Sequence, residues 1–304
     1  MDKLAAMRVF VAIVDGGTLT EAARRLGKSL PSVVRSLARL EEALGLRLLE
    51  RSTRQSYLTP EGRSYYETCC HVLSEIDTAE QDLAAQQGEP AGEVRITAPV
   101  EFGNRFVWPC LRDIRERSPG LVPHVTLTDV PLDLVEGGYD LAVRIGPQPD
   151  SEMRATVIGE MPTRHCAAPA FLERVGRPER PEDMAGMPAV CVDIAGRRTG
   201  QLWPYLDEDG KRRTFRCKAV LYVNEVRMAR AACEAGVGLG FFYLYQVHDA
   251  IADGRLVSLF EDRRPPPQPV RLIRHAARER PKRVSAAIDA LEGALRQALK
   301  GLGA

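Results

Sequence analysis

The 304-residue sequence predicts an α/β protein made of a small helical module, one long helix and a larger α/β region. Three observations predict this order. Apolar residues recur at helical intervals as far as residue 44, one unbroken helical pattern runs from Thr59 to Gln87, and beyond residue 92 short β-like runs alternate with helical stretches. Residues 86–92 are polar and rich in glycine and proline, so they mark the clearest boundary. We therefore expect modules at 1–58, 59–88 and 89–304.

Two helices are expected at the N-terminus. The packed face of the first should consist of apolar residues at helical spacing, and these are Leu4, Met7, Val11 and Val14. Two glycines at 16–17 stop this helix. A short second helix then begins with Thr18 or Thr20 as its N-cap, and Glu21 completes a capping box if the cap is Thr18.

A third helix is expected from Leu30 to Leu44. Ser29 is placed as its N-cap, and Pro31 lies in its first turn, where a missing amide hydrogen costs nothing. The core-facing residues step by four, three and four, and they are Val33, Leu37, Leu40 and Leu44. The opposite face then carries the residues available to a DNA major groove, which are Ser32, Arg35, Ser36 and Arg39.

Positive charge is concentrated around this third helix. Residues 24–54 contain eight basic and three acidic residues, whereas the whole chain has a net charge of only +1. Such a concentration is typical of phosphate contact, although a solvated helix face would also explain a charge run on its own. The stretch LRLLERSTRQSYL then predicts two short strands around a polar tip, a wing in which Arg51 and Arg54 contact an adjacent minor groove or phosphates.

The N-terminal motifs resemble those of the LysR-type transcriptional regulators. The matching stretches are AARRLGKSLPSVV, LEEALG, RSTR and LTPEG. The resemblance implies a winged helix-turn-helix with these DNA-binding residues: Thr18, Lys28, Ser29, Leu30, Pro31, Ser32, Val34, Arg35, Ser36, Arg39, Arg51 and Arg54. Leu30 and Val34 stand where this family usually has glutamine and serine, so at these positions a thymine methyl is the expected contact.

The long helix is expected to begin at Thr59 and Pro60, which cap it. It carries an apolar stripe with steps of four and three, which we assign to dimerisation: Tyr65, Cys69, Val72, Ile76, Ala79 and Leu83. A helix of this length, roughly 40 Å at 1.5 Å per residue, suits the separation of two modules. The alternative is an ordinary amphipathic helix packed on its own domain. In the resembling family this element is the linker helix that pairs subunits, which implies a homodimer or homotetramer.

The region after residue 92 is expected to contain mainly parallel sheets. Its β-like runs are Val94–Thr97, Val125–Thr128, Leu141–Ile145, Val190–Val192, Val220–Val223 and Leu239–Tyr243. The stretches GEVRITAP, YDLAVRIG, ERVGRPERPEDM and GVGLGFF are similar to the effector-binding domain of the same family, which is built like a periplasmic binding protein. The resemblance implies a first lobe at 92–162 and 268–304, a second at 163–267, and a ligand cleft between them.

Cleft residues are expected where strands end, because open α/β sheets bind ligands there. The candidates are Pro99, Val100, Glu101, Phe102, Asp129, Arg144, Ile145, Gly146, Asn224, Glu225, Phe241 and Tyr243. Structural alternatives exist for several of them, since the two aromatic residues would also suit a core, Glu225 a helix N-terminus and Arg144 an ion pair. Arg144 predicts a small organic acid as effector, but Glu101 and Asp129 leave the charge of the ligand open.

The remaining signals favour a regulator over an enzyme. No nucleotide-binding loop, nucleophile elbow or zinc-protease motif occurs, so we expect neither catalysis nor a cofactor. The seven cysteines include no C-x-x-C pair, which disfavours a metal site, although a thiol-based redox sensor stays open. No secretory signal or long apolar run appears, so a cytoplasmic location is expected and a solute-binding protein is the weaker alternative.

The sequence therefore predicts a sequence-specific, effector-controlled transcriptional regulator. Its expected partners are double-stranded operator DNA, a small-molecule effector, further copies of the chain and RNA polymerase, with no membrane partner. The mechanism implied by the resemblance is a shift between domain arrangements when the effector binds.

Overall fold

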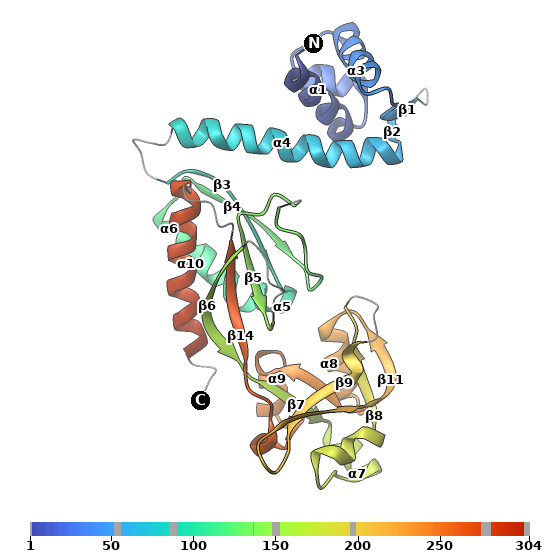
Figure 1. The fold of residues 1–304 in the computed structure, drawn as a ribbon, viewed down its shortest axis with the longest axis vertical. Coiled ribbons are helices and arrows are strands. Elements are labelled where there is room, and N and C mark those ends of the chain that lie inside the picture. The colour runs from blue at the N-terminus through green and yellow to red at the C-terminus, as the bar shows by residue number, and fades with distance from the viewer. Residues whose placement is uncertain are drawn as a thin grey trace. The chain divides into compact units, whose positions relative to one another are not determined.

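The computed structural model describes residues 2–51, 56–84, 90–135, 137–147, 153–194, 199–274 and 281–300. They form two compact units. One is built from the chain up to residue 92, and the other holds residues 93–135 together with 139–304 (Figure 1). The order of helices and strands in the two units is that of a helix-turn-helix module, a long helix and an α/β region.

The first unit is a winged helix-turn-helix followed by a long helix. Its elements are α1 (Lys3–Gly16), α2 (Leu19–Arg25), α3 (Leu30–Leu44), β1 (Leu49–Arg51), β2 (Ser56–Leu58) and α4 (Pro60–Ala84). Thr18 is the N-cap of α2, because its hydroxyl oxygen accepts from the backbone N–H of Glu21 at 3.1 Å. Ser29 occupies the N-cap position of α3 as predicted, but its hydroxyl makes no capping hydrogen bond. The antiparallel pairing of β1 with β2 confirms the predicted hairpin.

The predicted packed face of α1 was partly wrong. Met7 is buried as expected, and the half-buried Val11 and Val14 pack against the same core, but Leu4 is 42% exposed. The buried side chains of this helix are Ala6, Met7, Val9, Phe10 and Ile13. The reason is tertiary, since α1 is contacted by α2, α3 and α4 and therefore buries a broader face than a helix with one neighbour.

The first half of α4 belongs to the core of this unit. Cys69 is fully buried there, and the ring of Tyr65 lies 6.0 Å from that of Phe10. The dimerisation assignment was therefore wrong for Cys69, which takes the alternative of intramolecular packing, whereas Tyr65 is half-buried against the same core. Val72 and Ile76 are half-buried. The side chains of Ala79 and Leu83 lie outside the described part of the chain.

The junction between the wing and α4 explains the LTPEG motif. Thr59 donates its hydroxyl hydrogen to the carbonyl of Arg47 at 2.8 Å and accepts from the N–H of Gly62 at 2.8 Å. A Cβ at Gly62 would lie 1.9 Å from the carbonyl oxygen of Leu48. Only glycine lets the first turn of α4 approach the wing this closely.

The first lobe of the second unit is a five-stranded sheet in the order β4-β3-β5-β14-β6. Its strands are β3 (Gly92–Ala98), β4 (Leu121–Leu127), β5 (Leu141–Ile145), β6 (Arg154–Met161) and β14 (Gln268–Arg274). After β3 come α5 (Val100–Phe102), a π-helical turn (Gly103–Val107) and α6 (Trp108–Arg117), and the described chain ends with α10 (Lys282–Lys300). Residues of α6 and α10 share one hydrophobic core with this sheet.

The second lobe has a sheet of its own. It consists of a three-stranded part, β12 (Gly240–Tyr243), β7 (Thr163–Ala167) and β13 (Val257–Leu259), and a two-stranded part, β11 (Lys218–Val223) and β8 (Pro188–Val192), while β9 (Leu202–Leu206) and β10 (Arg212–Arg216) form a separate hairpin. A parallel bridge between Ala189 and Leu239 joins β8 to β12. The helices are α7 (Pro169–Val175), α8 (Val226–Glu234) and α9 (Leu244–Ala252), and short 3-10 turns span Pro181–Gly186, Thr199–Gln201 and Glu261–Arg263.

The expectation of mainly parallel sheets was wrong. β3 pairs with β5 and β8 with β11 in parallel, but β14 runs antiparallel to both β5 and β6, and β7 runs antiparallel to both β12 and β13. The chain passes from the first lobe to the second between β6 and β7, and it returns before β14. The strands that adjoin these two crossings carry the antiparallel pairings.

Replacing Gly62 with alanine should destabilise the first unit. The added methyl group would strike backbone rather than a mobile side chain, so we expect the free energy of unfolding to fall by about 1–3 kcal/mol. Urea unfolding of the full chain measures this. The matched control is Gly293→Ala, an exposed position inside α10 with no atom within 4 Å of the new Cβ, which should instead stabilise by about 0.5–1 kcal/mol. An unchanged midpoint for Gly62→Ala would contradict the close approach.

Candidate functional site

The exposed face of α3 is the first candidate site. Lys28, Arg35 and Arg39 are exposed, and none of them forms an ion pair with a described residue. Leu30 is 41% exposed although it is apolar, and Val34 is half-buried. Of the other predicted contacts, Pro31 is exposed, and Ser32 and Ser36 are half-buried. Unpaired cations beside exposed apolar groups suit a surface that meets phosphates and base edges together.

Two carboxylates organise the surroundings of this face. Glu41 accepts from the backbone N–H groups of Leu48 and Leu49 at 2.8 and 3.3 Å, which ties the wing to the end of α3. Glu21 pairs with Arg24 and Arg25 at 2.6 and 3.0 Å, and hydrogen bonds from these two arginines lower the pKa of Glu21 to about 2. The positive charge of α2 is thus partly neutralised, whereas that of α3 is not. Arg54 and the side chain of Arg51 lie outside the described part of the chain.

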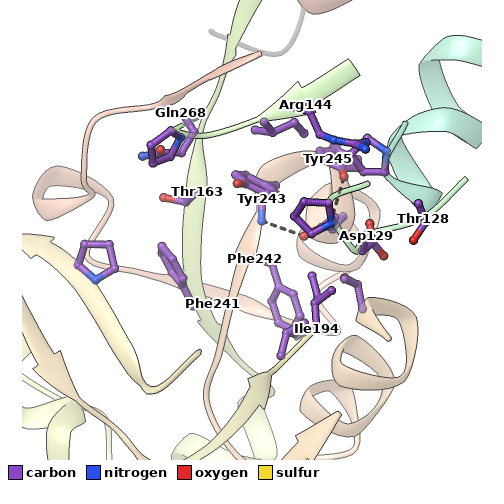
Figure 2. Close-up of a pocket in the computed structure, with 18 of the residues that line it drawn as sticks. Thr128, Asp129, Arg144, Thr163, Ile194, Phe241, Phe242, Tyr243, Tyr245 and Gln268 are labelled. Carbon is purple, nitrogen blue, oxygen red and sulfur yellow. Dashed lines mark hydrogen bonds between the residues drawn. The ribbon is translucent and has the colours of Figure 1, made fainter. Parts of the chain in front are cut away.

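The second candidate site is a cavity of about 500 Å³ in the second unit (Figure 2). Both lobes line it. The first lobe contributes Pro99, Thr128, Asp129, Pro131, Arg144, Ile145, Pro147 and Gln268, and the second contributes Thr163, Val192, Ile194, Pro204, Arg212, Val226, Phe241, Phe242, Tyr243, Tyr245 and Gln246. Its size and its mixture of aromatic walls with a few polar groups are typical of small-molecule sites.

The aromatic wall of the cavity, formed by Phe241, Phe242, Tyr243 and Tyr245, is held in place by α9. The side-chain oxygen of Gln246 accepts from the N–H of Tyr243 at 3.0 Å, and its amide group donates to the hydroxyl of Tyr245 at 3.3 Å. Burial raises the pKa of Tyr243 to about 12, so both tyrosines present neutral hydroxyls. Arg105 of the first lobe donates to the carbonyl of Tyr245 at 2.9 Å, which joins the two lobes beside the cavity.

Two charges of opposite sign also line the cavity, one on the buried Arg144 and one on the half-buried Asp129. Arg144 is 8% exposed, and it donates to the carbonyl of Val143 at 3.2 Å and to the hydroxyl of Thr97 at 3.4 Å. Asp129 accepts from the N–H of Val100, at the amino end of α5, at 3.1 Å. Burial lowers the pKa of Arg144 and raises that of Asp129, because each charged form is desolvated.

The structure separates the predicted cleft residues into two groups. Six line the cavity: Pro99, Asp129, Arg144, Ile145, Phe241 and Tyr243. The other six do not line it, and they are Val100, Glu101, Phe102, Gly146, Asn224 and Glu225. Choosing Phe102 was wrong because its side chain is fully buried in the core of the first lobe. Glu225 takes its structural alternative as N-cap of α8, accepting from the N–H groups of Arg227 and Met228.

Glu101 also has a structural role instead of a place in the cavity. One of its carboxylate oxygens lies 3.7 Å from Arg230 of the second lobe. Burial raises the pKa of this carboxyl, and the nearby Arg230 opposes that shift. Arg230 in turn donates to the carbonyl of Gln246 at 2.7 Å. The pair therefore bridges the two lobes next to the cavity.

Several lining residues were missed by sequence reasoning. Thr163 and Gln268 are the first residues of the strands that follow the two crossings between lobes, and Tyr245 and Gln246 lie in the first turn of α9. The expectation that cleft residues follow the ends of strands does not predict these four positions. A usable signal for Tyr245 was the cluster of four aromatic residues in FFYLY, all of which line the cavity.

Comparison with known proteins identifies the family. Residues 4–63 match the model for the bacterial regulatory helix-turn-helix protein, lysR family, and residues 87–296 match the model for the LysR substrate binding domain. The chain belongs to the LysR family of transcriptional regulators. It is accordingly a DNA-binding transcriptional regulator with a winged helix-turn-helix and an effector-binding domain, as its motifs predicted.

Relatives and solved structures agree with this assignment. The chain is 28% identical to the activator AaeR of Escherichia coli, over 96% of this chain and 93% of that protein. It is 30% identical to the repressor PA14_22550 of Pseudomonas aeruginosa, over 85% and 81% respectively. The structure of CrgA from Neisseria meningitidis has a TM-score of 0.59 at 26% identity and covers 96% of this chain and 98% of its own. The virulence activator AphB of Vibrio cholerae shares the fold, with a TM-score of 0.62 at 23% identity over 96% and 99% of the two chains.

None of the helices in the described part of the chain is both long enough and apolar enough to span a membrane.

His165 packs against Phe241 of the aromatic wall, and it should make the stability of the folded protein depend on pH. Its ring stacks on Phe241 with centroids 4.6 Å apart, and burial lowers its pKa from 6.5 to about 4. The unfolded chain therefore binds a proton more readily, so stability should be lost as the pH falls from 6.5 towards 4. One pKa unit corresponds to about 1.4 kcal/mol, so protonation of His165 should lower the free energy of unfolding by about 3 kcal/mol.

The measurement is urea unfolding of wild type and His165→Phe across that pH range. The variant keeps an aromatic ring but cannot be protonated, so its stability should decline less. The exposed His248→Gln serves as control and should follow the wild type. Parallel pH dependence in all three proteins would show that His165 does not carry the effect.

Proposed function

We propose that this regulator reads its operator with the exposed face of α3 and responds to a small molecule held in the cavity of the second unit. The cavity is the observation that carries the effector half of this proposal, because the buried Arg144 and the half-buried Asp129 line it without forming an ion pair within 4.0 Å among the described residues. The exposed and unpaired Arg35 and Arg39 carry the DNA half.

An organic acid is the effector class suggested by Arg144. A guanidinium group offers two parallel donors that match a carboxylate, which an ammonium group cannot do. The neighbouring family member LysG of Corynebacterium glutamicum is described with a bound effector, Arg, although its 17% identity to this chain supports only a shared fold. The groups that line the cavity restrict which acid can bind.

The regulator would act as a dimer or a tetramer in the cytoplasm. Two winged modules related by symmetry would engage spaced half-sites. The half-buried Val72 and Ile76 of α4 are the part of the apolar stripe that supports pairing between subunits. Effector binding would shift a pre-existing balance of domain arrangements, altering the bend of the DNA or the half-site spacing and so the recruitment of RNA polymerase. No catalytic step forms part of this proposal.

Arg35→Ala should weaken specific binding more than non-specific binding. We expect about a 10- to 100-fold loss of affinity for the DNA upstream of the protein's own gene, because a base contact is worth about 1–3 kcal/mol. Titration against that duplex and a scrambled duplex at fixed salt measures the two losses. Arg112→Ala, an exposed arginine of α6, is the control and should change neither. Equal losses for both duplexes would reassign Arg35 to a phosphate contact.

Thiol-based sensing is the second candidate function, and one contact favours it. The sulfur atoms of Cys191 and Cys217 lie 3.4 Å apart, and both residues are buried. A hydrogen bond with Cys191 lowers the pKa of Cys217, which makes Cys217 the nucleophile. Its thiolate would attack one oxygen of a hydroperoxide and release the alcohol, and the Cys191 thiol would then displace water from the sulfenic acid to form a disulfide.

Hydrogen peroxide should therefore remove two hydrogen atoms from the wild-type protein, as measured by mass spectrometry under denaturing conditions. Cys191→Ser and Cys217→Ser should both abolish this loss. The buried Cys110→Ser should not, because Cys110 bonds to a backbone carbonyl instead of a second thiol. Operator affinity is measured on the same samples. A disulfide that leaves operator affinity unchanged would rule out a sensing role for the pair.

A further inference from the structure

The contacts that hold Asp129 and Arg144 in place restrict the ligand further than a preference for acids does. Asp129 is bound to the amino end of α5 through the N–H of Val100. A helix amino end is ordinarily a place where a ligand anion binds. Here the protein supplies its own carboxylate to that position, so a second anion there would meet like charge.

Arg144 is the complementary group. Its hydrogen bonds to described residues use only two of the five N–H donors of the guanidinium, and one of these bonds is long, at 3.4 Å to Thr97. No carboxylate of the described residues lies within 4.0 Å of it. A buried guanidinium with unused donors is costly for the folded protein unless a ligand completes its bonding.

The two charges interact electrostatically without touching. Each influences the pKa of the other, yet they form no ion pair within 4.0 Å. The backbone holds them apart, because Asp129 is tied to Val100 and Arg144 to Val143. In the view of Figure 2 the two side chains lie toward the same side of the cavity as Tyr245. A ligand with one group for each charge would bridge this gap.

A buried hydroxyl provides independent support for a polar ligand. Thr163 is 4% exposed and lines the cavity, and its hydroxyl oxygen has no hydrogen-bond partner among the described residues. Buried polar atoms of folded proteins are nearly always paired, so an unpaired one in a cavity wall points to a ligand group that pairs with it. Flat apolar side chains, which include Phe241 and Phe242, form another part of the wall.

We propose that the effector is a compact acid with a hydrogen-bond donor, hydroxyl or ammonium, close to its carboxylate. The carboxylate binds Arg144, the donor binds Asp129, and a flat apolar body occupies the aromatic wall. This inference rests on the proposed effector role of the cavity and makes Asp129 the residue that selects a hydroxy or amino acid over a plain acid. The geometry leaves the choice between hydroxyl and ammonium to experiment.

Four probes with the same phenyl body test the proposal on the full-length chain by calorimetric titration. They are phenylalanine, phenyllactate, hydrocinnamate and phenethylamine, the first two as both enantiomers. Phenylalanine or phenyllactate should bind at least about tenfold more tightly than hydrocinnamate, which lacks the donor. A hydrogen bond to a charged group contributes about 1.5–3 kcal/mol, which corresponds to about tenfold or more in affinity. Phenethylamine, which lacks the carboxylate, should bind more weakly still. If phenylalanine binds more tightly than phenyllactate, the donor is an ammonium group; if phenyllactate binds more tightly, the donor is a hydroxyl.

The variants assign each preference to a residue. Asp129→Asn keeps an oxygen for the N–H of Val100 but removes the charge, so the advantage over hydrocinnamate should shrink to about twofold or less. Arg144→Gln should lose all three acids, and Arg144→Lys, which keeps the charge without the fork of donors, should fall between. The matched control is Arg112→Gln, an exposed cation of α6 outside the cavity, which should bind the probes as the wild type does.

Two results would overturn the inference. One is hydrocinnamate binding as tightly as phenylalanine and phenyllactate, and the other is silence of every probe at millimolar concentration. Operator affinity is measured on the same samples with and without each probe. Probes that bind as expected but leave operator affinity unchanged support the ligand class and contradict the effector role, so the two failures are distinguishable.

Discussion

The cavity of the second unit depends on one constraint, which is that the chain passes twice between the two lobes. It crosses first at Pro162, between β6 and β7, and again before β14. The first residues after these crossings, Thr163 and Gln268, both line the cavity. The same crossings explain why the sheets are mixed, since β7 and β14 pair antiparallel with strands on both sides. Fold and site therefore have a common origin in the connection between the lobes.

The contrast between α3 and the cavity shows what a single sequence can predict. The bounds of α3, its cap at Ser29 and its core-facing side follow from residues within one helix, so local pattern was sufficient. The cavity assembles residues from strands far apart in the chain. Half of the predicted cleft residues line it, because the rule of strand ends applies to β3, β4, β5 and β12, but not to the crossings or to the first turn of α9.

The wrong assignments share a physical cause. Leu4 and Cys69 were placed by helical spacing alone, and spacing gives the apolar face of a helix without naming the partner that covers it. Cys69 is covered by the core of its own unit, whereas Leu4 is left exposed because α1 buries the neighbouring face around Phe10. Gly62 shows the opposite case. Its motif was visible in the sequence, but only the carbonyl of Leu48 explains why a glycine stands there.

The two functional surfaces use charge in different ways. On α3 the arginines are exposed and unpaired, so their attraction to phosphates is long-ranged and falls with salt. In the cavity, Arg144 is buried and Asp129 is half-buried, so their field is less screened than that of an exposed charge. Because Asp129 already accepts from the N–H of Val100, an anion at the amino end of α5 would meet like charge. Anion selection therefore falls to Arg144, and a positive partner for Asp129 becomes a feature that the ligand has to supply.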